Sequence, residues 1–397
     1  MAGVPRLTPG IPGDLSGRLD ALLMEADHRV AAAATRPSPG RQPVHTVYVP
    51  ADAFEADTTR QWGAVALAML EEHAPDPDAL GMDADVYRRV VAKLAGEPVE
   101  DLRVDFEDGY GARPDEEEDD HAVRAGALLR EPADGGRGLR VKSFEPATRA
   151  RALRTLELVL DSCGRVPDGL VVTLPKVSAP EQVTAMHEVC AAADDAFGGG
   201  PLRFEVQVET PHAVARMTEI VAAAGPRCAG LHYGTYDYSA ALGVAAAHQS
   251  LDHPVADHAK AVMQVAAATA GLRVVDGSSN VLPVGDGAAV HAAWALHRRL
   301  VRRSLERGVY QGWDLHPGQL VSRYAAVFAF YRDGLAAAAA RLRSYLDGVG
   351  GSVLDEPATA RALAGYLVRG LDCGALDEPE VTRATALSRP DLTTLTR

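Results

Sequence analysis

Short segments in which apolar and polar residues alternate recur along the whole chain. Because successive side chains of a strand point to opposite faces, such alternation predicts β-strands. The eight predicted strands cover residues 44–49, 102–106, 138–143, 169–174, 203–209, 228–234, 271–276 and 310–316. Between them lie segments rich in alanine and leucine at helical spacing, at 58–72, 84–95, 117–130, 147–163, 179–196, 212–224, 253–270 and 289–307.

This alternation of strands and helices predicts right-handed βαβ units and a parallel sheet. Eight units within about 280 residues match a (β/α)8 TIM barrel, for which roughly 250 residues is typical. The alternative is a doubly wound open sheet, which usually has a glycine-rich first turn. Here the first predicted strand is followed by PADAFEAD, without a GxGxxG motif. We therefore predict a TIM barrel.

The segments outside the eight units define the expected domain organisation. Residues 1–40 are predicted to form a short N-terminal extension with a helix at 15–34, and residues 41–325 the barrel. Residues 326–397 are predicted to form a C-terminal helical extension, with helices at 318–349 and 357–371 before a polar tail. The acidic run at 114–120 is expected to be a solvated helix N-terminus, because acids complement the helix dipole there.

Composition narrows the functional classes. The 397 residues are 47% hydrophobic and 24% charged, as in a soluble globular protein. A net charge of −14 argues against nucleic acid or an anionic membrane surface as a partner. The four cysteines show no metal-binding or disulfide spacing, and no apolar run approaches the roughly 20 residues that span a bilayer. We expect a cytoplasmic protein with no secretion signal.

Three of the predicted strands have an apolar face and a charged face. The outer face of a barrel packs against helices, so the charged faces are predicted to point inward, where each charge must be paired or bind a metal. Arg103 and Glu205 lie deep in their strands and are expected to form an internal salt bridge. The charged sets are Arg103, Asp105 and Glu107; Arg140 and Lys142; and Glu205, Gln207 and Glu209.

Active sites of TIM barrels lie at the carboxyl ends of the strands. His316 is expected there as a structural cap, although a role as base stays open, and His232 is expected to be a core histidine lower in its strand. The polar residues predicted at this rim are Asp105, Glu107, Asp108, Arg140, Lys142, Glu209, Asp237, Asp276 and His316.

Two rim carboxylates suggest a metal site. Glu209 and Asp237 follow consecutive predicted strands, and neighbouring strands lie about 5 Å apart. Two carboxylates without a nearby Cys/His cluster suit Mg²⁺, with Mn²⁺ as an alternative and with waters and substrate oxygens as further ligands. The sequence therefore predicts that Glu209 and Asp237 hold a divalent cation.

The segment GTYDYSAALG (234–243) adds a predicted substrate site. Gly234 lets a ligand approach the backbone, and the amides from Thr235 through Tyr236 to Asp237 could hold a carboxylate. A 2-oxo acid could bind the cation through its carboxylate and keto oxygens. Arg140, which faces this position in the predicted barrel, would then share the charge of an enolate oxygen.

Six motifs resemble those of a known family. In order they are DFEDGYG (105–111), LRVKSF (139–144), LPKV (174–177), VETP (208–211), GTYDYSAALG (234–243) and LHPGQL (315–320). Over about residues 45–325 their order and spacing are similar to those of the HpcH/HpaI aldolase and citrate lyase β-subunit family. The resemblance implies a Mg²⁺-dependent barrel that makes or breaks a carbon–carbon bond through an enolate. It also implies that Glu209 and Asp237 bind the metal and that Arg140 contacts substrate oxygens.

The chain departs from the family pattern in four places. Lys142 stands where the family usually has Asn, and we expect it to bind a substrate carboxylate or phosphate. The first strand reads HTVYVPAD in place of an Arg-Ser start and a Pro-Gly end. Residues 311–314 (QGWD) replace a common Gly-Lys, and the loop after the second strand has no His for a His–Asp dyad. These departures indicate a divergent branch.

The main hypothesis is thus a Mg²⁺-dependent lyase acting on a small 4-hydroxy-2-oxo acid or a β-hydroxyacyl-CoA, in which a carboxylate or a metal-bound water moves the proton. Asp105, Glu107 and Asp108 are the candidates for the general base or for a water-mediated contact with the metal. One alternative is a metal-independent Schiff-base aldolase that uses Lys176 or Lys142. Another is a barrel that binds a keto acid or CoA ester without turnover. From the family's trailing segment we also expect a homo-oligomer, a trimer or a hexamer.

Overall fold

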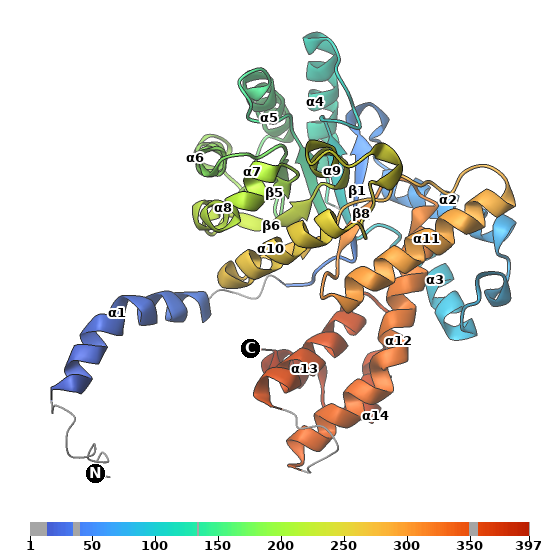
Figure 1. Cartoon of the computed structure of the whole chain (residues 1–397). Helices are drawn as coiled ribbons and strands as arrows, with labels where there is room; N and C mark the ends of the chain where they lie inside the picture. Colours follow the sequence, from blue (N-terminus) through green and yellow to red (C-terminus); the bar gives the residue numbers. More distant parts are fainter. Residues whose placement is uncertain (1–13, 35–39, 133–134, 349–355, 397) are drawn as a thin grey trace.

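The computed structural model describes residues 14–34, 40–132, 135–348 and 356–396. Its centre is a closed barrel of eight parallel strands (Figure 1), in the order β7-β6-β5-β4-β3-β2-β1-β8. A bridge between Val275 and Gln311 joins the two outer strands of this order. The predicted barrel is confirmed. The strands are β1 (His45–Pro50), β2 (Asp101–Asp105), β3 (Gly136–Arg140), β4 (Val171–Leu174), β5 (Arg203–Val208), β6 (Cys228–Tyr233), β7 (Arg273–Val275) and β8 (Gly312–Asp314).

Helices surround the barrel and follow the predicted segments, with one break. The predicted helix at 212–224 is divided at Arg216, where the backbone leaves helical geometry. The surrounding helices are α2 (Thr58–His73), α3 (Ala84–Gly96), α4 (Asp115–Leu129), α5 (Arg149–Cys163), α6 (Pro180–Phe197), α7 (Pro211–Ala215), α8 (Met217–Ala224), α9 (Thr235–Ala241), α10 (Pro254–Ala270) and α11 (Gly287–Glu306), with short 3₁₀ turns at Ala51–Ala53, Pro77–Leu80 and Ala246–His248.

The alternation in the strands separates two buried regions. Leu102, Val104 and Phe106 belong to the large apolar cluster that packs the sheet against the helices. Arg103 and Asp105, from the other face of the same strand, are also buried, at 3% and 1% exposed, because they point into the barrel. The barrel interior is therefore polar and rich in charge, which sets the conditions for any chemistry there.

The C-terminal region is helical throughout its described length. Helix α12 (Gln319–Leu346) crosses the predicted boundary at 325/326 without a break, and α13 (Pro357–Asp372) packs against it. The prediction of a polar tail was wrong, since α14 (Glu378–Thr385) and α15 (Arg389–Leu395) follow. Both are short helices stabilised by capping boxes, at Asp377 and Ser388. Helix α12 ends at Leu346, before the end of the predicted helix at 318–349, and residue 349 lies outside the described residues.

Helix α1 (Leu15–Ala34) runs away from the barrel (Figure 1). It confirms the predicted helix at 15–34, while residues 1–13 and 35–39 of the expected extension lie outside the described residues. The division into segments 1–40, 41–325 and 326–397 stays a prediction. Within the part of the chain that the structure describes, no helix is both long and apolar enough to cross a membrane.

Candidate active site at the carboxyl ends of the strands

A lysine lies at the centre of the predicted carboxylates. The ammonium of Lys176, just after β4, contacts Glu107 Oε1, Asp108 Oδ2 at 3.0 Å and Asp237 Oδ2 at 3.1 Å. The backbone amide of the same residue donates to Glu209 Oε1 at 2.7 Å. One residue thus connects four acids from three separate loops. From the sequence, Lys176 is a Schiff-base candidate only, and its contacts with these acids are not predicted.

The backbone of Lys176 is unusual. Its φ of +52° lies in the left-handed region, which it shares with only one other non-glycine residue of the described chain, Ala386. For a residue with a Cβ this conformation costs roughly 1–2 kcal/mol, and it persists where the surrounding contacts determine it. Here it directs both the amide and the side chain of Lys176 toward carboxylates.

Glu209 is 3% exposed, and its pKa is raised to about 7 because burial disfavours the charged form, against the opposing effect of Lys176. Its second oxygen accepts a hydrogen bond from the Gln207 amide. Gly234 makes this position possible, since a Cβ there would lie 2.5 Å from Glu209 Cβ and 2.6 Å from Oε2. Burial also raises the pKa of Glu107. In this cluster the carboxylates therefore outnumber the cationic side chains that could neutralise them.

Arg140 forms the floor of the site. Its Nε and Nη2 donate to the two oxygens of Asp105 at 2.7 and 2.6 Å, and its Nη1 lies 3.3 Å from Glu107 Oε2. The guanidinium also lies 4.8 Å from the centre of the Tyr48 ring. Asp105 in turn accepts the backbone amides of Glu107 and Gly109. Arg140 is buried and held in one orientation, with Glu107 between it and Lys176.

Lys142 points elsewhere. Its ammonium donates to the carbonyl of Phe106 at 2.7 Å and lies 2.8 Å from Glu118 Oε2 on helix α4. Glu118 is only 1% exposed, so the expectation of a fully solvated acidic run was wrong for this member. A buried acid needs paired cations, and Glu118 has two, Lys142 and Arg151, whose Nε lies 3.2 Å from Glu118 Oε1. The predicted contact of Lys142 with substrate stays a prediction.

Thr235 and Tyr236 lie in the first turn of α9. Their hydroxyls donate to the carbonyl of Ser278 at 3.3 and 3.2 Å, and the Tyr236 oxygen accepts the Asn280 amide at 2.5 Å. These contacts hold the loop after β7 against α9. The side chain of Asp237, in the same turn, is 47% exposed. The carboxylate of Asp237 is therefore accessible to solvent, whereas that of Glu209 is buried.

The remaining polar rim residues have structural contacts. Asp276 pairs with the buried Lys260 at 3.0 Å. His316 Nδ1 accepts the Gly318 amide at 3.1 Å, which fits the expected cap, and burial lowers the pKa of His316. Deeper in the barrel, His232 Nε2 lies 2.9 Å from Glu205 Oε2, as expected for a core histidine. The rim site therefore reduces to the acids around Lys176 and to Arg140.

The donor set fits a hard divalent cation in its chemistry. Glu209 and Asp237 both contact one cationic residue, Lys176, and both offer only oxygen. Across residues 14–34, 40–132, 135–348 and 356–396, no three or more His, Cys, Asp or Glu side chains converge as a complete metal site. Mg²⁺ is commonly bound through one or two carboxylates together with water and substrate oxygens. Two acids are therefore sufficient protein ligands.

The fold and the rim cluster define a (β/α)8 barrel with an acidic site at the carboxyl ends of its strands. The family model described as Domain of unknown function (DUF6986) matches residues 23–397, and the chain belongs to this family. None of the curated proteins matches the chain.

Among solved structures, a citrate lyase from Burkholderia xenovorans LB400 has a TM-score of 0.62 and 21% identity, covering 89% of this chain and 98% of its own. Protein CitE from Mycobacterium tuberculosis, in complex with magnesium, acetoacetate and coenzyme A, has a TM-score of 0.52 and 20% identity, covering 85% of this chain and 99% of its own. At these identities the comparison shows a shared fold.

Proposed function

We propose that this protein is a Mg²⁺-dependent carbon–carbon lyase, a divergent relative of the HpcH/HpaI aldolases and citrate lyase β-subunits. The observation that carries the proposal is that Glu209 and Asp237, from consecutive β/α loops, both contact Lys176 at the carboxyl end of the barrel, Glu209 through the backbone amide and Asp237 through the ammonium. The fold shared with citrate lyase and with magnesium-complexed CitE supports it. The substrate proposed is a small 4-hydroxy-2-oxo acid or a β-hydroxyacyl-CoA.

Mg²⁺, or alternatively Mn²⁺, would be held by Glu209 and Asp237 and would act as a Lewis acid toward the substrate carbonyl. Arg140 would supply a fixed positive charge for the oxygen on which negative charge develops, and its two hydrogen bonds to Asp105 keep it oriented before substrate arrives. Gly234, Thr235 and Tyr236 would border the substrate carboxylate.

A carboxylate beside Arg140 would move the proton. Glu107 is the strongest of the three candidates, because burial raises its pKa toward the range in which a base exchanges protons near neutrality. Both oxygens of Asp105 are committed to one edge of the Arg140 guanidinium, where they accept from Nε and Nη2. Asp108 lies closer to solvent and has its pKa lowered, since the hydrogen bond and charge of Lys176 outweigh the opposing effect of burial.

The Schiff-base alternative is less well supported. An amine that attacks a carbonyl must be neutral. Although burial acts in the opposite direction, Glu107 and the neighbouring acids raise the pKa of Lys176 above its usual value. Lys142 is paired with the buried Glu118. Borohydride trapping with pyruvate tests this alternative directly, because only an imine leaves a covalent adduct on the protein.

The decisive experiment measures Mg²⁺-dependent cleavage of candidate substrates by the wild type, Glu209→Gln and Asp237→Asn. We expect each variant to lose at least about 100-fold in kcat/KM, as for removal of a group that stabilises developing charge. Circular dichroism and urea unfolding establish that the variants fold. Unchanged activity in either folded variant would refute the metal assignment.

Two further outcomes separate the remaining alternatives. Ligand binding in a thermal shift assay without any turnover would favour a non-catalytic keto-acid or CoA-ester binding barrel. Light scattering tests the proposed homo-oligomer, for which we expect a trimer or hexamer, and a monomeric mass would contradict it.

A further inference from the structure

Two aromatic side chains lie together inside the barrel. Tyr48 of β1 and Trp313 of β8 come from strands that pair in the sheet, with Thr46 opposite Trp313. Their ring centroids are 4.5 Å apart, and with Val275 they form a small buried cluster that is separate from the large apolar cluster outside the barrel. Tyr48 and Trp313 are 5% and 6% exposed. The polar interior of the barrel therefore includes an aromatic surface.

This aromatic pair lies against the guanidinium of Arg140. Arg140 is opposite Asp105 in the sheet, and Asp105 is opposite Pro50 of β1. Tyr48, two residues before Pro50, lies on the same face of β1, one level nearer the amino-terminal end. The Arg140 Cζ atom is over the Tyr48 ring, 4.8 Å from its centre, and 6.0 Å from the centre of the Trp313 ring. Because a ring face attracts a cation within about 6 Å, Tyr48 makes the main contact, and Trp313 supports it by packing against its ring.

The ring of Tyr48 complements the hydrogen bonds that Arg140 makes with Asp105. Those bonds lie along one edge of the guanidinium, at Nε and Nη2, and a group held along one edge can still tilt about it. Nη1, away from that edge, lies 3.3 Å from both Glu107 Oε2 and Gln207 Oε1. A ring face packed on the guanidinium opposes the tilt and so fixes the position of Nη1.

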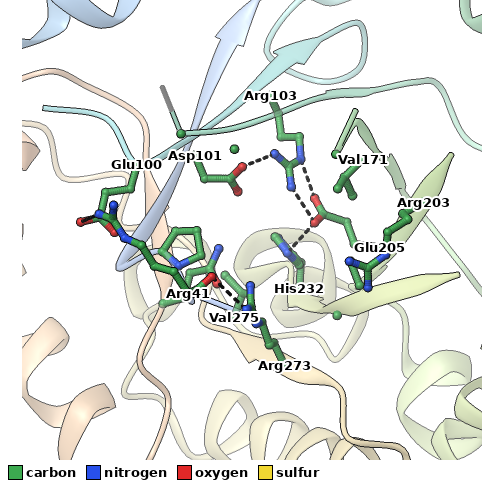
Figure 2. Close-up of a pocket in the computed structure, with 17 residues that line it drawn as sticks. Arg41, Glu100, Asp101, Arg103, Val171, Arg203, Glu205, His232, Arg273 and Val275 are labelled. Atoms are coloured by element: carbon green, nitrogen blue, oxygen red, sulfur yellow. Dashed lines mark hydrogen bonds and ion pairs between the residues drawn. The ribbon is translucent and has the colours of Figure 1, made fainter. Parts of the chain in front are cut away.

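Trp313 is anchored from the amino-terminal side. Its Nε1 donates to His232 Nδ1 at 2.9 Å, and His232 Nε2 lies 2.9 Å from Glu205 Oε2. An indole N–H can only donate, so His232 Nδ1 accepts and Nε2 carries the proton toward Glu205. Figure 2 shows His232, Glu205 and Arg103 at the wall of a polar cavity of about 390 Å³ at the amino-terminal end of the barrel. The aromatic pair thus connects this buried network to the rim.

We propose that Tyr48, supported by Trp313, is a positioning residue that holds Arg140 in the orientation required for catalysis. Arg140 Nη1 would face the substrate oxygen on which negative charge develops, and the ring would keep it there before substrate arrives. The catalytic consequence rests on the proposed lyase function, whereas the orienting contact does not. Because the charge on that oxygen develops only in the transition state, loss of the ring should lower kcat and leave KM nearly unchanged.

The first test compares kcat and KM for Mg²⁺-dependent cleavage by the wild type and by variants of Tyr48. Tyr48→Leu removes the ring face and should lose about 10-fold in kcat, with KM changed by less than about 2-fold. Tyr48→Phe keeps the ring and should retain most of the activity. Tyr48→pentafluorophenylalanine keeps the shape but reverses the charge of the ring face, so it should lose activity as Tyr48→Leu does. It replaces the leucine variant if that variant does not fold.

A double-mutant cycle distinguishes positioning from a structural role. Arg140→Lys keeps the charge but has no planar group for the ring to orient. If Tyr48 acts through Arg140, adding Tyr48→Leu to Arg140→Lys should change kcat by less than about 2-fold. Tyr366→Leu is the matched control, because it removes a ring from the C-terminal helices, 5.0 Å from that of Tyr331, and should leave kcat unchanged. Multiplying losses in the double variant, or full kcat in Tyr48→Leu, would overturn the proposal.

A structural measurement separates this proposal from the proposed function. Crystal structures of the metal-free wild type and of Tyr48→Leu, or of the fluorinated variant, locate the guanidinium of Arg140 with and without the ring face. We expect Nη1 to leave Glu107 and Gln207 in the variant, and an unchanged guanidinium would contradict the positioning role. If the wild type cleaves no candidate substrate, the lyase proposal fails, and these structures alone decide whether Tyr48 orients Arg140.

Discussion

At the amino-terminal end of the barrel, Arg103 is enclosed by Asp101 and Glu205 in a buried network in which each carboxylate has its cation. At the carboxyl-terminal end, a single ammonium, that of Lys176, serves several carboxylates, and the pKa of Glu209 is raised to about 7 by burial. The difference is thermodynamic. The lower network is complete and stabilises the fold, whereas the upper cluster gains from an added cation.

The two ends also differ in the direction of their charge imbalance. Four arginines and three acids line the cavity at the amino-terminal end, whereas at the rim the single ammonium of Lys176 contacts three carboxylates. Arginines thus outnumber acids at one end of the barrel interior, and acids outnumber cations at the other. Each imbalance can be changed by single substitutions.

The largest effect is expected in the lower network. Arg103→Met leaves Asp101 and Glu205 buried without their shared cation, and removal of one partner of a buried pair costs about 3–5 kcal/mol. Urea unfolding at pH 7 measures this loss. Adding Glu205→Gln to Arg103→Met should recover part of it, since one uncompensated charge is removed. A loss no larger than that of the exposed control Arg216→Gln would contradict the assignment of a structural role.

The next effect concerns pH and the metal-free rim. Because the folded pKa of Glu209 is raised from 4.5 to about 7, the folded state binds more protons than the unfolded state between these values. The free energy of unfolding should therefore fall as pH rises from 4.5 to 7, by up to about 3 kcal/mol at about 1.4 kcal/mol per pKa unit. Unfolding curves in a chelator measure the slope. Glu209→Gln should flatten it, and an equal slope in this variant would assign the effect to another group.

The smallest effect concerns competition at the rim. Lys176→Met removes the ammonium that contacts Asp237, so we expect Mg²⁺ to bind about 10-fold more tightly, or by about 1.4 kcal/mol. Isothermal titration measures the affinity. Lys142→Met is the matched control, because that ammonium pairs with Glu118 and should leave Mg²⁺ binding unchanged. Weaker binding by Lys176→Met would show that the lysine supports the ion rather than competing with it.

Much of the fold could be predicted because the strands carry strict alternation. In β2 the apolar Leu102 and Val104 and the charged Arg103 and Asp105 occupy opposite faces, and this pattern alone places the charges inside a barrel. The broken helix at Arg216 and the helices after residue 377 were not predicted. In both cases local backbone geometry and helix capping determine where a helix ends or begins. These features leave little trace in the spacing of apolar residues along the sequence.

The members of the rim site could be predicted more easily than their contacts. Glu209 and Asp237 follow strands that pair in the sheet, so their proximity follows from topology. The orientation of Lys142 toward α4 depends on its ion pair with Glu118. Glu118 is distant in sequence from Lys142, and within the acidic run at 114–120 nothing distinguishes it from the solvated acids. The central position of Lys176 depends on its positive φ, and no residue pattern reveals that in a lysine.

The unbroken course of helix α12 has a consequence for how the molecule unfolds. Near its start, Arg323 lies 2.8 Å from Asp314 at the end of β8, and farther along, Tyr331 and Leu342 are buried in the same apolar cluster as α13. Melting of the C-terminal helices would therefore expose the strand that closes the barrel. Barrel and C-terminal helices should lose structure in one cooperative transition, so that proteolytic removal of the tail would require opening of the whole barrel.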